Sequence, residues 1–365
     1  MPVYLHGVAT AVPDTAYSQD AALAVMQAWV GGDRRTDHLL HRIYRHSGIE
    51  RRHSVVGDFA PDGARGFYLE PDSGAFRNPG TAERNDRYAR EALRLFPEVA
   101  GRALARSGRF GPDDVTHVVT VSCTGFVAPG PDLAVVQQLG MRSSVERYHL
   151  GFMGCYAAFP ALRMARAFCL ADPRAVVLVA AVELCSLHLQ PSCELDALVA
   201  GSVFADGAAA AVVSAREPAA GGLRLDGFAG AVAREGASAM AWTIGDTGFD
   251  MVLSSYVPKI VGARAREAVE PLLEAANVPR QAVAEWAVHP GGRAILDRVQ
   301  DGLGLPEGGL DASRTVLAHY GNMSSATVLF VLREILERRP EVGRAVVAMA
   351  FGPGLTVDTG LFAVA

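Results

Sequence analysis

The most restrictive feature of the sequence is an unbroken apolar run at residues 175–182, in which polar and apolar positions do not alternate. A strand of this kind is buried on both faces, as in a sheet covered by helices on either side. Similar short runs at 117–121 and 208–214 predict two more strands. Helical patterns occupy residues 82–105 and 157–171. This alternation of strands and helices predicts an α/β fold.

The second part of the chain repeats the alternation. We expect helices and strands there at 261–276, 286–288, 293–302, 323–338, 345–350 and 355–365. Between the two parts lies a polar segment rich in proline and glycine, residues 215–222, which is the best candidate for a boundary. A chain of 365 residues has the length of two closely packed units. We therefore predict two α/β halves, residues 1–218 and 219–365.

Composition and charge exclude several classes of function. Half of the residues are hydrophobic, which is typical of a compact globular protein and not of a disordered chain. The net charge of −5 leaves no basic stripe for binding nucleic acid. No apolar stretch approaches the roughly 20 residues that a membrane-spanning helix needs, and the first residues lack the pattern of a secretory signal. We expect a cytoplasmic protein without a membrane span.

The cysteines fit neither a disulfide framework nor a zinc site. Their number, five, is odd, and the chain does not resemble a secreted one, which argues against paired disulfides. Cys185 and Cys193 lie too far apart for a Cys-x-x-Cys pair, and His188 between them is expected to be packed or exposed. No metal site is therefore expected.

Cys155 is a candidate nucleophile. It ends the segment Gly-Phe-Met-Gly-Cys and stands where a strongly apolar helix is expected to begin, with Pro160 tolerated in the first turns. The partial positive charge at a helix N-terminus favours a thiolate over a thiol. The alternative is that Cys155 is simply a small buried hydrophobic residue, as free cysteines often are.

Two further polar residues stand at the ends of predicted elements. His289 ends an apolar strand and precedes Pro-Gly-Gly, where a histidine can act as a base or fill a structural role. Asn322 enters a predicted helix, where it can be an N-cap or can supply an amide donor to an oxyanion or enolate. With Cys155 they would make a nucleophile, a base and an anion stabiliser.

The motifs around these residues resemble those of the type III polyketide synthases, the chalcone synthase-like family. The matching segments are Gly-Phe-Met-Gly-Cys155, Trp-Ala-Val-His289-Pro-Gly-Gly, Tyr-Gly-Asn322-Met-Ser-Ser and Phe351-Gly-Pro-Gly-Leu-Thr. Weaker similarity extends over nearly the whole chain. The resemblance implies a homodimer and the thiolase fold, in which two duplicated α/β halves form a five-layered core.

The resemblance also implies the chemistry. Cys155 would take an acyl group from CoA, His289 would keep the sulfur a thiolate, and His289 with Asn322 would stabilise the enolate formed when malonyl-CoA loses carbon dioxide. Preorganised donors in a dry pocket lower such a barrier by several kcal/mol. Repeated attack of the enolate on the Cys155 thioester would give a poly-β-keto chain that cyclises. The implied substrates are an acyl-CoA starter and malonyl-CoA, with no resident cofactor.

Further positions match the family's substrate-binding residues. These are Phe204, Met251, Cys123, Ser324, Gly352, Gly354 and Arg42. Phe204 corresponds to an aromatic guard of the entrance, the two glycines to a loop that lets the backbone approach the substrate, and Arg42 to a region that binds CoA phosphates. Each position also has an ordinary explanation, such as core packing, a tight turn or a solvated helix face.

The product is not specified by these motifs. Met251, Cys123 and Ala128 depart from the plant pattern and suggest an aliphatic or fatty acyl starter and a pyrone or resorcinol product. Two other functions stay open at this point. A β-ketoacyl carrier-protein synthase III would use the same three residues on a carrier-protein substrate, and a cysteine-dependent thioester hydrolase would need water and no enolate. The segments after His289 favour the polyketide synthases.

Overall fold

The computed structural model describes residues 1–60, 63–64, 66–219, 221–236 and 238–365. In the first half, the strands and α-helices are β1 Tyr4–Ala11, β2 Thr15–Ser18, α1 Gln19–Val30, α2 Arg34–Arg45, β3 Arg51–Ser54, α3 Thr81–Ser107, β4 His117–Ser122, α4 Pro131–Gln138, β5 Glu146–Gly151, α5 Ala158–Ala171, β6 Val176–Leu184, α6 Leu195–Val203 and β7 Asp206–Ser214. In the second half, they are β8 Leu223–Val232, β9 Met240–Gly245, β10 Gly248–Leu253, α7 Val257–Ala275, β11 Val283–Val288, α8 Arg293–Leu303, α9 Asp311–Tyr320, α10 Thr327–Glu337, β12 Ala345–Gly352 and β13 Thr356–Val364.

One strand pattern occurs twice. The main sheet has nine strands in the order β11-β12-β13-β8-β1-β7-β6-β4-β5. The first half contributes β1-β7-β6-β4 and the second half contributes β8-β13-β12-β11; in each set the first two pairings are antiparallel and the third is parallel. The two sets meet where Tyr4 and Leu5 of β1 pair with Arg224 and Leu223 of β8. The strands therefore confirm the predicted duplication.

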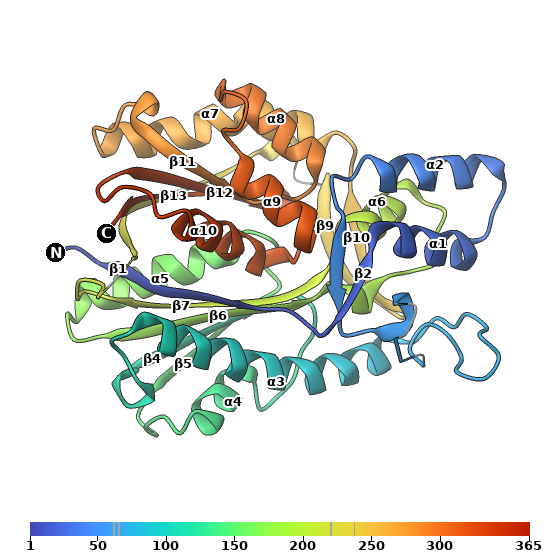
Figure 1. Cartoon of the computed structure of the whole chain (residues 1–365), viewed down its shortest axis with the longest axis horizontal. Coiled ribbons are helices and arrows are strands. Elements are labelled where there is room, and N and C mark those ends of the chain that lie inside the picture. Colours follow the sequence, from blue (N-terminus) through green and yellow to red (C-terminus); the bar gives the residue numbers. More distant parts are fainter. Residues whose placement is uncertain (61–62, 65, 220, 237) are drawn as a thin grey trace.

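Helices complete five layers, which lie one above another in Figure 1. Helices α3 and α4 cover the outer face of the first set of strands, α5 and α10 lie between the two sets, and α7 with α8 covers the outer face of the second set. Leu162 of α5 and Leu329 of α10 pack in one cluster with Val179 of β6 and Ala348 of β12. Every residue of β6 is buried, as the apolar run predicts. The molecule thus has the α/β, five-layered thiolase fold.

The ends of the core elements differ from the predicted ends by a few residues. The helix expected at 323–338 begins as a 3-10 turn, Ser324–Ala326, and becomes α10 at Thr327. The strand expected at 286–288 starts earlier, at Val283. Residues 215–222 contain the connection from β7 to β8, except that residue 220 lies outside the described residues.

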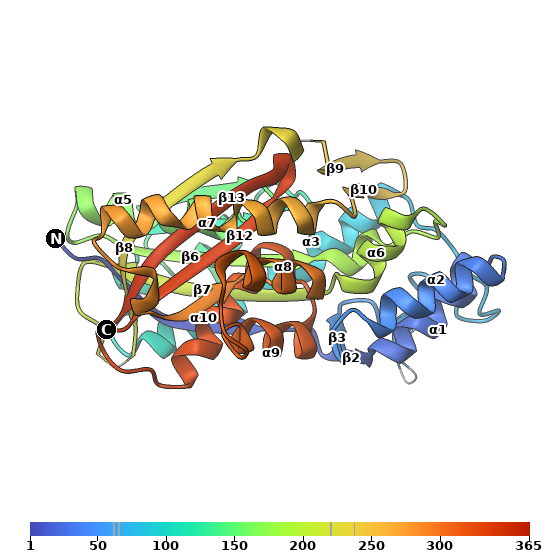
Figure 2. The same cartoon turned by 90° about the horizontal axis from the view of Figure 1, so that it is seen from above.

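A smaller group of elements, called the side group below, stands beside the five layers and is not predicted by the sequence patterns. It contains α1, α2, α6 and the two-stranded sheets β2–β3 and β9–β10 (Figures 1 and 2). The side chains of Ser18 and Asp33 cap the N-termini of α1 and α2. Across the described residues, no helix is both long and apolar enough to cross a membrane.

Candidate active site

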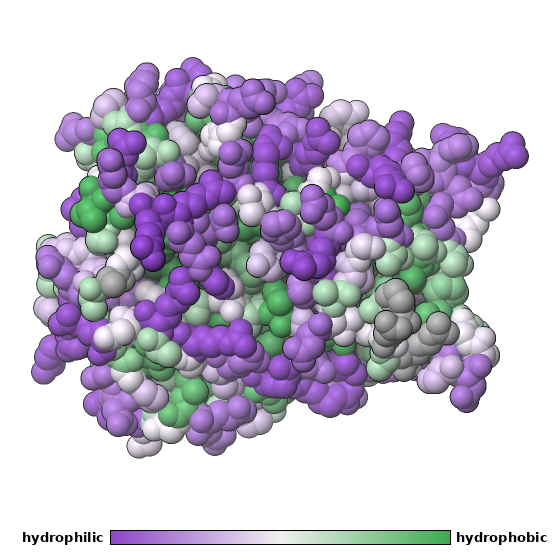
Figure 3. Space-filling view, viewed as in Figure 1, coloured by the Kyte–Doolittle hydropathy of each residue, from purple (hydrophilic) through white to green (hydrophobic). Residues whose placement is uncertain are grey.

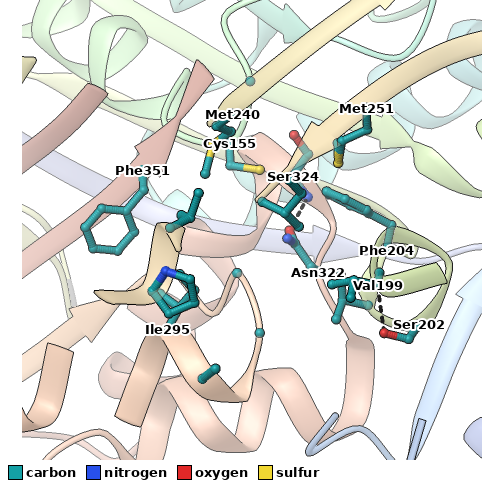
Figure 4. A pocket seen from close by; sticks show the side chains of 18 of the residues that line it. Cys155, Val199, Ser202, Phe204, Met240, Met251, Ile295, Asn322, Ser324 and Phe351 are labelled. Carbon is teal, nitrogen blue, oxygen red and sulfur yellow. Dashed lines mark hydrogen bonds between the residues drawn. The ribbon is translucent and has the colours of Figure 1, made fainter. Parts of the chain in front are cut away.

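A cavity of about 250 Å³ brings residues from both halves together. Cys155 lines it from the first half, and His289 and Asn322 line it from the second. Figure 4 shows Cys155, Ser324 and Asn322 around a common space, with residues of α6 on one side. The three residues that the sequence analysis assigns to the chemistry therefore share one cavity.

The backbone before Cys155 makes a tight turn between β5 and α5. Phe152 and Gly154 both have positive φ, 58° and 81°. A side chain at Gly154 would place its Cβ 2.2 Å from Cδ of Pro353, so glycine is required at this close approach. Helix α5 begins at Ala158, one residue after the start of the helix predicted at 157–171 and three residues after Cys155. The thiol lies just before the first turn.

The surroundings of Cys155 hold it as a thiol. Burial raises the pKa of Cys155 to about 11; hydrogen bonding from Ser324 and Asn322 lowers it, and the charge of Glu183 raises it. Burial therefore outweighs the contribution expected from the helix N-terminus. A thiolate has to be formed by transfer of its proton to a base.

His289 is the candidate base. Its main-chain N–H donates to the Met349 carbonyl at 2.8 Å, which extends the β11–β12 pairing by one residue. Burial lowers the pKa of His289 to about 3, so the imidazole is neutral at pH 7. Both ring nitrogens are buried and have no hydrogen-bond partner among the described residues. They are available to a group that enters the cavity.

Asn322 is held by the main chain of the first half. Its N–H donates to Val203 O at 2.8 Å, and its carbonyl accepts from Ala205 N at 2.9 Å. Its side-chain Oδ1 accepts from Ser324 N at 2.9 Å (Figure 4). Asn322 is therefore not the N-cap of α10, which begins at Thr327; instead its side chain closes the turn before it. This bond leaves the amide nitrogen as the donor of the side chain, the group that can hydrogen-bond to Cys155.

Four of the predicted substrate-binding residues line the cavity. They are Phe204, Met251, Cys123 and Ser324. Phe204 directly follows α6, and Met251 lies in β10, so the side group of elements supplies one wall. Cys123 is buried, and its sulfur accepts a hydrogen bond from Gly154 N at 3.0 Å.

Gly352 and Gly354 lie beside the cavity, and their neighbours line it. The wall contains Phe351 and Pro353. A Cβ at Gly352 would lie 2.3 Å from the Tyr156 ring, and Gly354 has a φ of 71°. Both positions thus favour glycine for steric reasons, and contact with a substrate remains a prediction for them.

Arg42 is exposed on α2 and does not line the cavity. Helix α2 lies along the outer edge of the molecule, where hydrophilic side chains cover it (Figures 1 and 3). His46, which caps the C-terminus of α2, does line the cavity, as does Arg293 at the start of α8. Basic residues are therefore present in the cavity wall next to α2 and α8. The role of Arg42 stays a prediction.

Several wall residues escape the sequence analysis. Trp242 of β9 lines the cavity and donates from Nε1 to Cys123 O at 3.0 Å. A second cavity of about 440 Å³ adjoins this wall. The two cavities share Cys185, Leu195, Phe204, Trp242 and Met251. No periodicity marks Trp242 as a site residue, because β9 belongs to a small sheet outside the core.

Comparison with known proteins assigns the family. Residues 4–218 match the N-terminal domain of chalcone and stilbene synthases, and residues 229–364 match the C-terminal domain. This chain belongs to the chalcone and stilbene synthase family. It is therefore a type III polyketide synthase, an enzyme that transfers and condenses acyl groups.

The similarity to other type III polyketide synthases covers nearly the whole chain. It is 32% identical to 1,3,6,8-tetrahydroxynaphthalene synthase of Streptomyces peucetius subsp. caesius, over 96% of this chain and 90% of the relative. It is 29% identical to Probable polyketide synthase 1 of Dictyostelium discoideum over 97% of this chain, which corresponds to 11% of that protein. The solved structure of PKS-I from the brown alga Ectocarpus siliculosus has a TM-score of 0.91 and 31% identity, covering 100% of this chain and 99% of that one.

Proposed function

We propose that this enzyme condenses an acyl-CoA starter with malonyl-CoA units and cyclises the resulting poly-β-keto chain. The observation that carries the proposal is the convergence of a thiol, an imidazole and a carboxamide, Cys155, His289 and Asn322, on one cavity. Membership of the chalcone and stilbene synthase family supports it. The remaining residues of the wall bear on which starter is used.

The first step loads the starter on the enzyme. His289 is neutral and takes the proton of Cys155, and the thiolate attacks the carbonyl carbon of the starter thioester. The bond to the CoA sulfur breaks, and the CoA thiolate leaves with a proton. The thiolate and the imidazolium stabilise each other while both exist in the low-dielectric cavity.

The second step makes the carbon nucleophile. When malonyl-CoA loses carbon dioxide, the electron pair of the broken bond moves into an enolate whose charge lies on the thioester oxygen. The one ring N–H of neutral His289, whose two ring nitrogens have no partner among the described residues, and the Asn322 amide are donors that need no reorganisation to receive this charge. The enolate carbon then attacks the Cys155 thioester, which forms the new carbon–carbon bond and releases the thiolate.

The wall between the two cavities favours an aliphatic or fatty acyl starter. The residues shared by the two cavities are apolar apart from the Cys185 thiol and the Trp242 indole N–H, which is already bonded to Cys123 O, whereas the rest of the second cavity also has polar residues such as Gln190 and Asp196. Met251 is a flexible side chain that adapts to a chain of varied length. We therefore propose a pyrone or resorcinol product from such a starter.

The remaining assignments follow from the same proposal. Arg293, which lines the cavity, and Arg42, which lies one helical turn before the cavity residue His46, offer positive charge for the phosphates of CoA. Both substrates bring their own activated thioester, so the proposed chemistry is complete without a resident cofactor. We propose that the enzyme acts as a cytoplasmic homodimer.

The test is to incubate the protein with malonyl-CoA and a panel of acyl-CoA starters and to identify products by mass spectrometry. A Cys155→Ala variant is expected to lose all condensation. Cys193→Ala is the matched control, because Cys193 is exposed and does not line either cavity; its product yield should equal that of the unaltered enzyme.

Two outcomes would contradict the proposal in different ways. Condensation that requires a carrier protein would favour the carrier-protein synthase alternative. Release of free acid without carbon dioxide would favour the hydrolase.

A further inference from the structure

Glu183 is a buried carboxyl group at the end of β6 that no step above uses. It is fully buried. Its Oε2 accepts hydrogen bonds from Cys123 N and from the Thr124 hydroxyl, both at 2.9 Å. Its Oε1 accepts from the Ser325 hydroxyl. The donors come from both halves of the molecule, because Cys123 and Thr124 follow β4 and Ser325 lies in the turn before α10.

These hydrogen bonds connect the two turns that carry the reacting groups. On one side, Cys123 Sγ accepts from the N–H of Gly154, the residue before Cys155. On the other side, Ser325 lies three residues after Asn322, whose Oδ1 accepts from Ser324 N. The Glu183 carboxyl group therefore hydrogen-bonds both to Cys123, which supports the Cys155 turn, and to Ser325, which lies in the Asn322 turn.

The same carboxyl group faces several titratable side chains. Burial raises the pKa values of the Cys123, Cys155 and Cys185 thiols and of the Tyr88 phenol, and the charge of Glu183 raises them further. Within the described part of the chain, the partners of Glu183 are neutral donors, and no arginine, lysine or histidine bonds to it. Burial raises the pKa of Glu183 to about 7, against the opposing effect of its hydrogen bonds. Its charge therefore changes near neutral pH.

We propose that Glu183 is a positioning residue: its carboxyl group holds the Cys155 turn against the Asn322 turn, and its charge sets how readily the Cys155 thiol ionises. The catalytic part of this inference rests on the proposed function, whereas the ionisation part concerns the thiol alone. As the pH rises through 7, Glu183 gains its charge and opposes formation of the Cys155 thiolate. The thiolate fraction should then rise less steeply with pH near 7, where Glu183 ionises, and with the ordinary steepness of a single thiol at higher pH, where Glu183 is already charged.

The charge is tested by alkylation, which needs no substrate. Iodoacetamide is reacted with the protein from neutral to alkaline pH, and modification of the Cys155 peptide is followed by mass spectrometry. In the Glu183→Gln variant we expect the midpoint of Cys155 alkylation to fall by roughly 1 pH unit and the weaker rise near pH 7 to disappear. Asp206→Asn is the matched control, because Asp206 is also a fully buried carboxyl group but bonds to Ser186 and Val55 instead; its profile should equal that of the unaltered protein. Equal midpoints in the Glu183→Gln variant and the unaltered protein would overturn the proposal.

The positioning is tested by Glu183→Asp, which keeps the charge and shortens the reach by one methylene group. We expect the alkylation midpoint to stay in place while carbon dioxide release from malonyl-CoA falls about tenfold or more. Full release from this variant would refute the positioning role. If the unaltered protein shows the expected alkylation profile but releases no carbon dioxide, the proposed function fails and the charge effect stands.

Ser325→Ala gives a second route if Glu183→Gln does not fold. It removes one donor and so should raise the Glu183 pKa further, which moves the shallow part of the alkylation curve to higher pH. An unmoved curve in this variant would count against the charge effect.

Discussion

At the scale of single residues, Trp242 divides the space that is open to a growing chain. Its ring lines both cavities, and its indole N–H is tied to the Cys123 carbonyl. His188 and Phe249 contact the ring edge to face, with centroids 5.7 Å away in each case. A ring held by a hydrogen bond and by two edge-to-face contacts is a rigid wall, so we infer that it limits the length of chain that the cavity of Cys155 accepts.

Replacing Trp242 by alanine should therefore change the product and preserve the chemistry. We expect Trp242→Ala to give products with at least one more extension unit, because the two cavities merge, while carbon dioxide release stays within about threefold of the unaltered enzyme. Product masses and carbon dioxide release measure the two effects. Ile244→Ala is the control, since Ile244 lies two residues further along β9 and is 58% exposed. Identical product masses in all three proteins would show that Trp242 is not the limit.

The residues around the site differ in how far the sequence identifies them. Cys155, His289 and Asn322 stand out because each follows a strand or a glycine turn and carries a reactive group. The sequence gives one indication of Glu183: it is a charged residue directly after the apolar run 175–182, where burying an unpaired charge would be costly. Its partners come from distant segments, so its role follows only from the fold.

At the scale of elements, the C-terminus of α6 is held by polar side chains from the side group. Arg52 of β3 is buried, and its Nη1 donates to the carbonyls of Gly201 and Phe204 at 2.8 and 2.7 Å. Gln19 of α1 donates to Ser202 O at 2.7 Å. These bonds satisfy the last carbonyls of α6, which carry its negative partial charge, and they fix the main chain of Phe204 at the cavity.

Removing the Arg52 cation should destabilise this junction. We expect Arg52→Gln to lower the free energy of unfolding by about 3 kcal/mol, because a shorter neutral side chain leaves buried carbonyls without donors. Urea denaturation measures the change. Arg51→Gln, at the exposed neighbouring position of β3, should shift it by no more than about 0.5 kcal/mol. Equal stabilities of the two variants would contradict the assignment of Arg52 as the cap of α6.

Much of the core is predictable from the sequence, whereas the side group is not, and the sequence patterns also leave out the core elements β1, β5, β8, α4 and α9. Strand β6 and helix α3 have one dominant pattern each, a continuous apolar run and a long helical period. Helix α6, with the sequence LDALVAGSV, is a short apolar run that periodicity cannot separate from a strand. Because α6, β9 and β10 form a wall of the cavity, periodicity leaves this wall open, and only the family motifs point to Phe204 and Met251 in it.

At the scale of the whole molecule, the duplication places the site where the two halves meet. The first half supplies Cys155 after β5, and the second half supplies His289 after β11 and Asn322 before α10. The halves also meet at β1, which pairs with β7 of its own half and with β8 of the other. The junction that assembles the reacting groups is thus also a continuous sheet, and a loss of stability at β1 should affect both halves.

His6 of β1 makes this junction sensitive to acid. Its Nε2 hydrogen-bonds to the Ser214 hydroxyl at 2.9 Å, its Nδ1 is buried without a partner among the described residues, and burial, with the charges of Arg109 and Arg216, lowers its pKa from 6.5 to about 4. Above pH 6.5 the imidazole is neutral in the folded and unfolded chains alike. Below pH 6.5, His6 binds a proton in the unfolded chain but stays neutral in the folded chain, so the folded state loses stability as the pH falls towards 4.

We therefore expect His6→Gln to reduce the acid-induced loss of stability. The difference in free energy of unfolding between pH 7 and about pH 4 should shrink by up to about 3 kcal/mol, which is the linkage of one group over this range. Urea denaturation at the two pH values measures it, with His41→Gln as the control because His41 is exposed on α2. Burial also lowers the pKa values of His188 and His289, so every variant still loses some stability in acid. The quantity to compare is therefore the slope of the free energy of unfolding against pH. A slope in His6→Gln equal to that of the control would mean that the β1 junction does not set the response to acid.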